Sequence, residues 1–350
     1  MQNMTPIAPA RNVVVAYGEV LLRLKSPGFE RLLQSPRLEV CIGGAELNVL
    51  ASLARFGHAA RLVTTLPENA LGAGALAEIR ALCIGTDDIA LRRSGRMGLY
   101  FAESGQGFRT GQVIYDRAGS SFALDEDVRS WTDLLSEATL LHLTGITPTL
   151  SLHCAASGLA GAQHARRMGL KVSLDVNFRA QLWATAPQSQ EVALVPILHQ
   201  AHIVFASSAD LAAAFGLPCE RQAESPIDNF QRLSAQALER LPQLEVICTY
   251  LRSGEHADSA RLIAVGRSRS GFYRSTERLI HSMADRIGTG DAFAAGVLHW
   301  LLRGFDIDRA LEFGLAAAAL KHSIPGDVNR VTEAEVTACL SGVSAGILRR

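Results

Sequence analysis

Strand-like and helix-like segments alternate along most of the chain, and this alternation limits the possible folds more than any other feature of the sequence. Short runs of β-branched and apolar residues are mostly followed by stretches with apolar residues at i, i+3 and i+4. The strand-like runs are 13–17, 61–66, 98–102, 112–115, 139–144, 171–176, 202–206, 245–250 and 261–265, and the helix-like stretches are 45–57, 70–82, 151–168, 227–241, 291–303 and 307–322. Strands connected through helices pair in parallel, so the pattern predicts an α/β fold with a mainly parallel sheet between helices.

One part of the chain departs from this alternation. Residues 98–102 and 112–115 are strand-like but are joined by the glycine-rich SGQGFRTG without a helix, which predicts a β-hairpin. Residues 20–42 also lack a long helical pattern. We therefore expect a single α/β domain over residues 1–350, with a small antiparallel lid formed by about 20–42 and 94–124.

The charge balance and the lack of an export or membrane signal narrow the function classes. The chain has 34 Lys and Arg against 34 Asp and Glu, so no overall field attracts nucleic acid or an anionic membrane. The start, MQNMTPIAPA, has no signal-peptide pattern, and no 18 apolar residues run unbroken. The six cysteines show no spacing typical of a zinc site or a disulfide scaffold. These features predict a cytoplasmic enzyme or binding protein with neither a nucleic-acid nor a membrane partner.

The lysines exclude the most familiar phosphate-binding motif. Only Lys25, Lys171 and Lys321 are present, and none lies in the G-K-[ST] context of a Walker A loop. The H-R-D and D-F-G triplets of protein kinases are also absent. Any phosphate must therefore be bound by backbone amides and arginines.

The segment DRIGTGD, residues 285–291, predicts an anion-binding site. Gly288 and Gly290 permit a tight turn, and a helix is expected to begin at about Asp291 with its first amides pointing outward. These amides and the helix dipole favour a phosphate or a developing negative charge. Asp291 would stand where a general base could reach an attacking hydroxyl, or it would only cap the helix.

A second helix opened by glycines begins in GGAELN, residues 43–48. Side chains at i and i+4 share a helix face, so Asn48 lies one turn below Gly44. Its amide could be presented to a polyol close to the backbone, or it could simply be solvated.

With these motifs, the chain resembles the ribokinase (PfkB) family of carbohydrate kinases and, within it, the 2-keto-3-deoxygluconate kinases. GGAELNVLASLARFG is similar to the N-terminal signature of the family, and DRIGTGD to its C-terminal signature. Further segments that match in family order are GLYF, VIYDRAGSSFA, HLTGITP, SLDVNFRAQLW and KHSIPGD, so the resemblance extends from about residue 12 to 340. It implies a ribokinase-like three-layer fold, with a twisted sheet and a β-lid that closes over the sugar and helps form a homodimer or a dimer-based oligomer.

The resemblance also implies an activity. The enzyme would use ATP with Mg²⁺ and would phosphorylate the primary hydroxyl of 2-keto-3-deoxy-D-gluconate. An aldolase can split the resulting 6-phosphate in the Entner–Doudoroff route. Asp291 corresponds to the general base, and the anion hole for the ATP phosphates to Gly288, Thr289 and Gly290. The positions that correspond to sugar-binding residues are Gly43, Gly44, Asn48, Tyr100, Tyr115, Arg117, Arg179 and Asp327. Arg117 and Arg179 suit a substrate carboxylate because guanidinium groups bind it through paired donors.

Two segments differ from the family pattern. The N-x-x-E motif is replaced by SSAD at 207–210, which leaves Asp210 as a Mg²⁺ ligand through water. Residues 249–262 match the glycine-rich nucleotide segment poorly. One alternative is a non-catalytic sugar-binding protein whose nucleotide site has decayed, which these two segments favour. The other is a kinase of the same fold for 2-keto-3-deoxygalactonate or fructose, because the sequence does not distinguish one epimeric hydroxyl.

Overall fold

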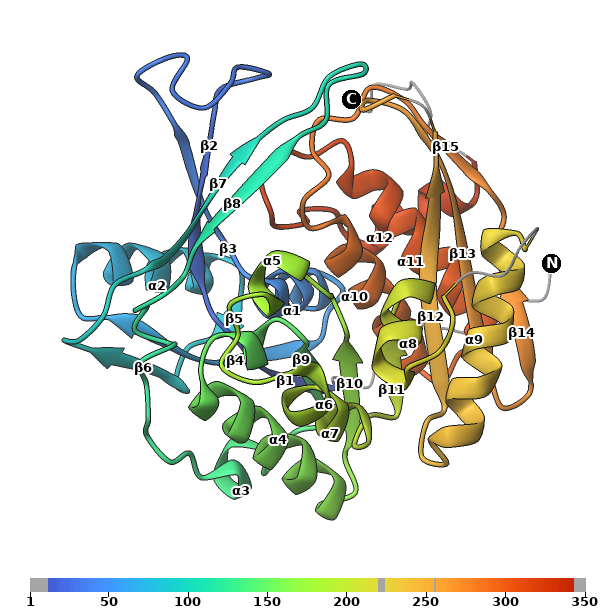
Figure 1. Ribbon diagram of the computed structural model, residues 1–350, viewed down its shortest axis with the longest axis horizontal. Helices are drawn as coiled ribbons and strands as arrows, with labels where there is room; N and C mark the ends of the chain where they lie inside the picture. The colour runs from blue at the N-terminus through green and yellow to red at the C-terminus, as the bar shows by residue number, and fades with distance from the viewer. Residues whose placement is uncertain (1–11, 220–223, 255, 343–350) are drawn as a thin grey trace.

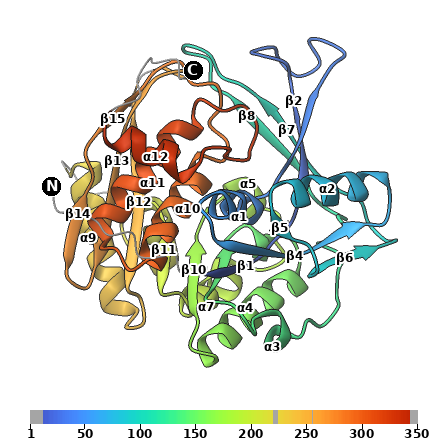
Figure 2. The same cartoon turned by 180° about the vertical axis from the view of Figure 1, so that it is seen from behind.

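A twisted central sheet runs through the molecule with helices on both of its faces (Figures 1 and 2). The computed structural model describes residues 12–219, 224–254 and 256–342, and within these ranges the sheet has eleven strands. Its main path is β14 (Gly271–Arg274), β13 (Ala260–Ser268), β12 (Val246–Ser253), β11 (Ile203–Phe205), β10 (Lys171–Asp175), β9 (Leu140–Thr144), β1 (Val13–Tyr17), β4 (Ala59–Pro67) and β5 (Ile84–Gly85). Beside this path, β6 (Ile89–Arg92) pairs with β4, and β15 (Arg278–Ile280) pairs with β13.

The strand directions follow from the connections. All pairings from β12 through β5 are parallel, as expected where strands are joined through helices. β12, β13 and β14 instead follow one another through turns, and their pairings are antiparallel. The predicted α/β fold is therefore confirmed, with an antiparallel extension at one edge.

Each face of the sheet has its own helix layer and hydrophobic core. One core joins the sheet to α1 (Ala45–Arg55), α2 (Ala70–Ala81), α10 (Thr289–Leu302), α11 (Ile307–Lys321) and α12 (Glu333–Leu340). The other joins it to α3 (Trp131–Leu134), α4 (Leu152–Arg167), α5 (Ala180–Trp183), α7 (Val195–Leu198), α8 (Ser208–Phe215) and α9 (Pro226–Arg240), and the short α6 (Gln190–Ala193) directly precedes α7. In β1, Val14 and Ala16 enter the first core while Val15 and Tyr17 enter the second, because successive strand residues point to opposite faces. None of the helices in the described ranges is long and apolar enough to cross a membrane.

A second, four-stranded sheet forms the lid, which projects at the upper left of Figure 1. Its order is β3 (Glu39–Gly43), β2 (Leu21–Lys25), β7 (Gly98–Glu103) and β8 (Gln112–Asp116). The predicted hairpin is present as β7 and β8, and β2 and β3 are also antiparallel, whereas the central pair β2 and β7 runs parallel. The division of the chain into one domain with a lid stays a prediction.

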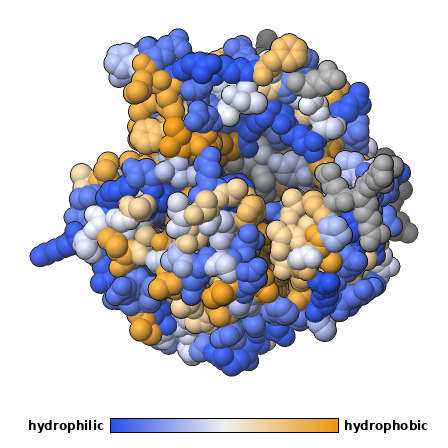
Figure 3. Space-filling view, in the orientation of Figure 1, coloured by the Kyte–Doolittle hydropathy of each residue, from blue (hydrophilic) through white to orange (hydrophobic). Residues whose placement is uncertain are grey.

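The tip of the lid contacts a distant part of the chain. At the tip of the β7–β8 hairpin, the carbonyl of Gly107 accepts a hydrogen bond from the amide of Ala257, and the rings of Phe108 and His256 lie 5.0 Å apart. The lid therefore bridges to the β12–β13 turn. Hydrophobic residues gather on the lid at the upper left of Figure 3. Val40 and Leu33, in the lid region, are exposed.

Candidate active site

A cavity of about 560 Å³ opens between the lid and the carboxyl ends of the central strands. Most of the residues proposed from the sequence line it, namely Gly44, Asn48, Tyr100, Tyr115, Arg117, Arg179, Asp210, Gly288, Thr289, Gly290, Asp291 and Asp327. Gly43 lies just outside, where a Cβ atom would come within 2.1 Å of the Asp327 Oδ2 atom. Gly43 thus permits β3 to approach Asp327 and is not part of the cavity wall. The functional roles of all these residues stay predictions.

The anion-hole segment begins its helix earlier than expected. Helix α10 starts at Thr289, not at about Asp291, and its N-cap is Gly288. Gly288 has a φ of 79°, which favours glycine, and a Cβ there would lie 1.9 Å from the carbonyl oxygen of Asp327. Asp291 is therefore in the first turn and does not cap the helix. The amides of Thr289, Gly290 and Asp291 have no intrahelical partner because they are the first of the helix.

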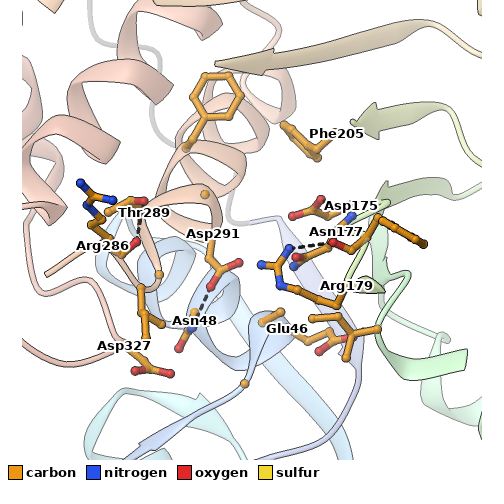
Figure 4. Close-up of a pocket in the computed structure, with 18 of the residues that line it drawn as sticks. Glu46, Asn48, Asp175, Asn177, Arg179, Phe205, Arg286, Thr289, Asp291 and Asp327 are labelled. Atoms are coloured by element: carbon orange, nitrogen blue, oxygen red, sulfur yellow. Dashed lines mark hydrogen bonds between the residues drawn. The ribbon is translucent and has the colours of Figure 1, made fainter. Parts of the chain in front are cut away.

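Asp291 lies at the centre of the cavity, with Asn48 pointing toward it from α1 (Figure 4). The Asn48 Nδ2 atom donates a hydrogen bond of 2.7 Å to Asp291 Oδ2. Burial raises the pKa of Asp291 to about 7, against the lowering effects of the Asn48 hydrogen bond and the Arg179 charge, and the negative charges of Asp327 and Glu46 add to the rise. A carboxyl group with a pKa near 7 is poised to exchange a proton at neutral pH.

Asn48 therefore differs from its expected role as a free sugar ligand. Its amide nitrogen is already bound to Asp291, while its Oδ1 atom is buried without a hydrogen-bond partner among the described residues. An unpaired buried acceptor at a cavity wall is costly unless a ligand hydroxyl donates to it. Asn48 can thus orient the carboxylate and bind a ligand at the same time.

A second carboxylate at the site, Asp175, was not selected from the sequence. It ends β10 and faces the cavity close to Asn177 and Arg179 (Figure 4). Burial raises its pKa well above the usual range, and the charges of Asp291 and Asp210 raise it further, while Arg179 lowers it. Its position at the end of a buried strand, in SLDVNFR, was the signal that could have identified it, because polar groups at the carboxyl ends of parallel strands meet at one edge.

Asp210 has a structural role in addition to its place in the cavity wall. Its Oδ2 atom accepts a hydrogen bond of 2.7 Å from the amide of Ser207, and the Ser207 hydroxyl accepts one from the amide of Asp210. This reciprocal capping box fixes the start of α8. The Asp210 carboxylate is therefore held in place at the cavity edge.

The two arginines expected to bind a carboxylate have different surroundings. Arg117 is buried, and its Nε atom donates to Oε2 of Glu19 at 2.5 Å. Arg179 is exposed to the cavity, and its Nη1 atom donates to the carbonyl of Phe178 at 3.2 Å. Glu19 was missed from the sequence because nothing in the spacing of residues 19 and 117 connects them.

A buried charged cluster joins the lid to the anion-hole segment. The Tyr100 hydroxyl donates to the carboxylate of Asp327, with oxygen distances of 2.7 and 2.6 Å. Arg23, from β2, pairs through Nη1 with Asp327 at 3.0 Å and with Asp285 at 2.8 Å. Burial raises the pKa of Asp327, against the opposing effects of Arg23 and Tyr100. Two residues proposed as sugar ligands, Tyr100 and Asp327, are therefore bonded to each other.

Comparisons with known proteins agree on one family. The sequence model described as "pfkB family carbohydrate kinase" matches residues 11–333. A protein of Haloferax volcanii named 2-dehydro-3-deoxygalactonokinase is 30% identical over 96% of this chain and 99% of its own length. The 2-dehydro-3-deoxygluconokinase of Bacillus subtilis is 23% identical over 90% of this chain and 91% of its own.

Solved structures give the same result for the fold. The crystal structure of 2-dehydro-3-deoxygluconokinase from Thermotoga maritima is 31% identical and superimposes with a TM-score of 0.88, covering 95% of this chain and 99% of that one. A putative ribokinase II from E. coli, solved in complex with ATP and Mg²⁺, is 17% identical with a TM-score of 0.75 and covers 95% of this chain and 99% of that one. At that identity the second likeness concerns the fold alone.

Proposed function

Because the chain belongs to the PfkB family of carbohydrate kinases, we propose that it transfers the γ-phosphate of ATP to the primary hydroxyl of 2-keto-3-deoxy-D-gluconate. The observation that carries this proposal is the buried Asp291 at the first turn of α10, with a pKa raised to about 7 and two arginines across the same cavity. A base, an anion-binding helix terminus and carboxylate-binding side chains then surround one substrate-sized space.

In the proposed reaction, Asp291 accepts the proton of the attacking hydroxyl. Asn48 keeps the carboxylate oriented, since its amide is already bound to Oδ2. The bond from the γ-phosphorus to the ADP oxygen breaks as the bond to the sugar oxygen forms, and the free amides at the start of α10 stabilise the charge on the transferred phosphoryl group in this loose transition state. Most of the rate enhancement would come from positioning.

The sugar acid would be oriented by charge and by planar hydroxyl groups. Arg179 and Arg117 both line the cavity and can donate to a carboxylate and a neighbouring keto oxygen. Tyr100 and Tyr115, whose ring centroids lie 6.3 Å apart on neighbouring lid strands, offer hydroxyl groups from the lid side. This arrangement supports an acidic substrate over a neutral sugar.

The donor set also fits a magnesium ion that accompanies ATP. Asp175 and Asp210 supply carboxylate oxygens, and the pKa of Asp175 is raised first by burial and then by the negative charges of Asp291 and Asp210, against the lowering effect of Arg179. Within the described ranges no group of three or more His, Cys, Asp or Glu forms a complete metal site. This suits Mg²⁺, which keeps several waters and binds through few carboxylates and the substrate phosphates. When bound, the ion would offset charge on the phosphates.

The test is release of ADP in a coupled assay with Mg·ATP and a panel of 2-keto-3-deoxygluconate, 2-keto-3-deoxygalactonate, gluconate, fructose and ribose. We expect turnover of the 2-keto-3-deoxy acids. Turnover of neutral sugars alone would contradict the assigned substrate class. Absence of turnover, with sugar still raising the melting temperature, would favour the sugar-binding protein instead.

The second candidate function is phosphorylation of 2-keto-3-deoxygalactonate, favoured by the name of the Haloferax volcanii relative. The two substrates differ at one hydroxyl, so the ratio of their kcat/KM values decides between them. A higher value for the galactonate would replace the gluconate as the assigned substrate.

Asp291→Asn tests the role of the base directly. The amide cannot accept a proton but keeps the shape, so we expect kcat to fall by about 10²-fold or more while sugar binding changes little. Asp308→Asn, an exposed change on α11, is the control. Near-normal turnover of Asp291→Asn would contradict the assignment.

The proposed assembly is a homodimer formed through the lid, in the cytoplasm. Val40 and Leu33 are exposed apolar side chains of the lid region that such an interface would cover. Light scattering of the purified protein measures the assembly, and a monomeric mass at micromolar concentration would contradict it.

A further inference from the structure

Lys321, the last residue of α11, is a buried cation that the proposed mechanism does not use. It is 0% exposed, whereas Lys171 is an exposed residue that pairs with Glu245. Its Nζ atom donates to the carbonyl of Ile324 at 3.0 Å and to that of Gly326 at 2.8 Å. A lysine is almost never fully buried unless its charge is compensated, so this position needs an explanation.

The loop that Lys321 holds lies directly against the anion-hole turn. A Cβ atom on Gly288 would lie 1.9 Å from the carbonyl oxygen of Asp327 and 3.3 Å from Cε of Lys321. The amide of Gly326 donates to Asp285 Oδ2 at 3.1 Å, and the other oxygen of Asp285 accepts from the amide of Ile287 at 3.1 Å. The 324–327 loop therefore sets the position of the backbone from which α10 begins.

The charge of Lys321 also balances this region. Two buried carboxylates, Asp285 and Asp327, face two buried cations, Arg23 and Lys321. Removal of Lys321 would leave one negative charge uncompensated next to amides that must bind phosphate. It would also leave the carbonyls of Ile324 and Gly326 without their donor.

We propose that Lys321 is a positioning residue whose ammonium group takes the place of a bound monovalent cation. It fixes the 324–327 loop under the anion hole, so phosphoryl transfer does not depend on any added monovalent ion. Carbonyl oxygens that hold an ammonium group can equally hold a small free cation, so the space left by a shorter side chain becomes a site for one. This inference rests on the proposed kinase function.

The experiment compares wild type, Lys321→Met and the surface control Lys171→Met in chlorides of tetramethylammonium, sodium, potassium, ammonium and methylammonium. For wild type and Lys171→Met we expect rates that agree within about two-fold in all five salts. For Lys321→Met in tetramethylammonium we expect kcat to fall by about 10²-fold, the scale of losing one anion-hole donor. Ammonium, methylammonium or potassium should restore at least one tenth of the lost rate with saturation, while KM for the sugar changes less than kcat.

Several results would overturn the proposal. One is a wild-type rate that drops more than ten-fold when tetramethylammonium replaces potassium, a result that requires no variant to fold. Others are a Lys321→Met rate within three-fold of wild type, and a lost rate that no small cation restores.

Failure of the proposed kinase function is separable from failure of this inference. A wild type that phosphorylates none of the sugars refutes the kinase. In that case amide hydrogen exchange still tests the positioning role: residues 286–292 should exchange faster in Lys321→Met than in Lys171→Met, and methylammonium should slow them again. Equal exchange in the two variants would refute the positioning role.

Discussion

The hydrogen bond from Asn48 to Asp291 offers a quantitative test of the base, because it lowers the pKa of a buried carboxyl group. Asn48→Leu removes the donor and keeps a similar volume. A hydrogen bond to a charged group contributes about 1.5–3 kcal/mol, and 1.36 kcal/mol corresponds to one pKa unit, so the pKa of Asp291 should rise by about 1–2 units from about 7. At pH 7 the ionised fraction would then fall from about a half to about 1–10%.

The assay is the pH dependence of kcat/KM for the sugar acid, which reports groups of the free enzyme. For wild type we expect a limb that rises with unit slope below about pH 7 and then levels off, because the base must be deprotonated. In Asn48→Leu the limb should move to about pH 8–9, with kcat/KM approaching a plateau only at high pH.

The matched control is Ser52→Ala, one turn further along α1, where the Ser52 hydroxyl donates to the carbonyl of Asn48. It should leave the limb in place. An unchanged limb in Asn48→Leu, or a wild-type limb near pH 4, would refute the argument that Asn48 tunes a buried base.

Two further predictions concern other buried groups. Glu19→Ala removes the carboxylate that accepts from Arg117, so the guanidinium should lose its fixed orientation and KM for the acid should rise about ten-fold, with kcat nearly unchanged. Initial-rate kinetics measure this, and an unchanged KM would show that Glu19 does not position Arg117. The second concerns His58 and His299, whose rings are bonded at 2.8 Å and whose pKa values are lowered to about 4 and about 3, first by burial. As pH falls below about 6.5, the unfolded chain binds protons at these histidines while the folded chain does not. The pair therefore contributes stability above about pH 6.5 that is lost as pH falls toward pH 4, and at pH 5 the free energy of unfolding is lower by about 2 kcal/mol per histidine. Urea unfolding at pH 7.5 and 5 measures it, and a double His58→Gln, His299→Gln variant with an undiminished pH dependence would contradict it.

The central elements could be predicted because each has enough residues to display a period. Strand β1, VVVAY, is apolar throughout, and helices such as α1 and α11 carry apolar stripes several turns long. The sequence did not predict β5, with two residues, or α3, with four, because so few residues carry no period. The conformation of these short elements is set by tertiary contacts and not by a local sequence pattern.

The start of α10 was placed wrongly for a local reason. An aspartate before an apolar run is a common N-cap, which favoured Asp291 as the first residue. The structure instead uses Gly288 in a left-handed conformation, because the carbonyl of Asp327 leaves no space for a side chain there. The deciding contact comes from a loop about 40 residues later, so the local pattern could not contain it.

The residues that line the site were largely predictable, but the hydrogen bonds and ion pairs between them were not. Resemblance identified Asn48, Arg117 and Tyr100 separately, and each proves to be bonded to a buried carboxylate. These contacts join residues 243, 98 and 227 positions apart, and no spacing rule connects such distant positions. Only the fold, which brings the lid, α1 and α10 to one edge of the sheet, creates them.

Because Arg117 and Arg179 have different partners, we expect them to contribute differently to substrate selectivity. Arg117 is already neutralised by the buried Glu19, so a sugar without a carboxylate leaves it paired and pays little penalty there. The guanidinium of Arg179 has no carboxylate within ion-pair distance among the residues that the structure describes, and only the Phe178 carbonyl accepts from it. Binding a neutral sugar would leave that charge without a partner in a cavity partly closed by the lid. We therefore expect Arg179 to account for most of the preference for an acid, while Arg117 fixes how that acid is oriented.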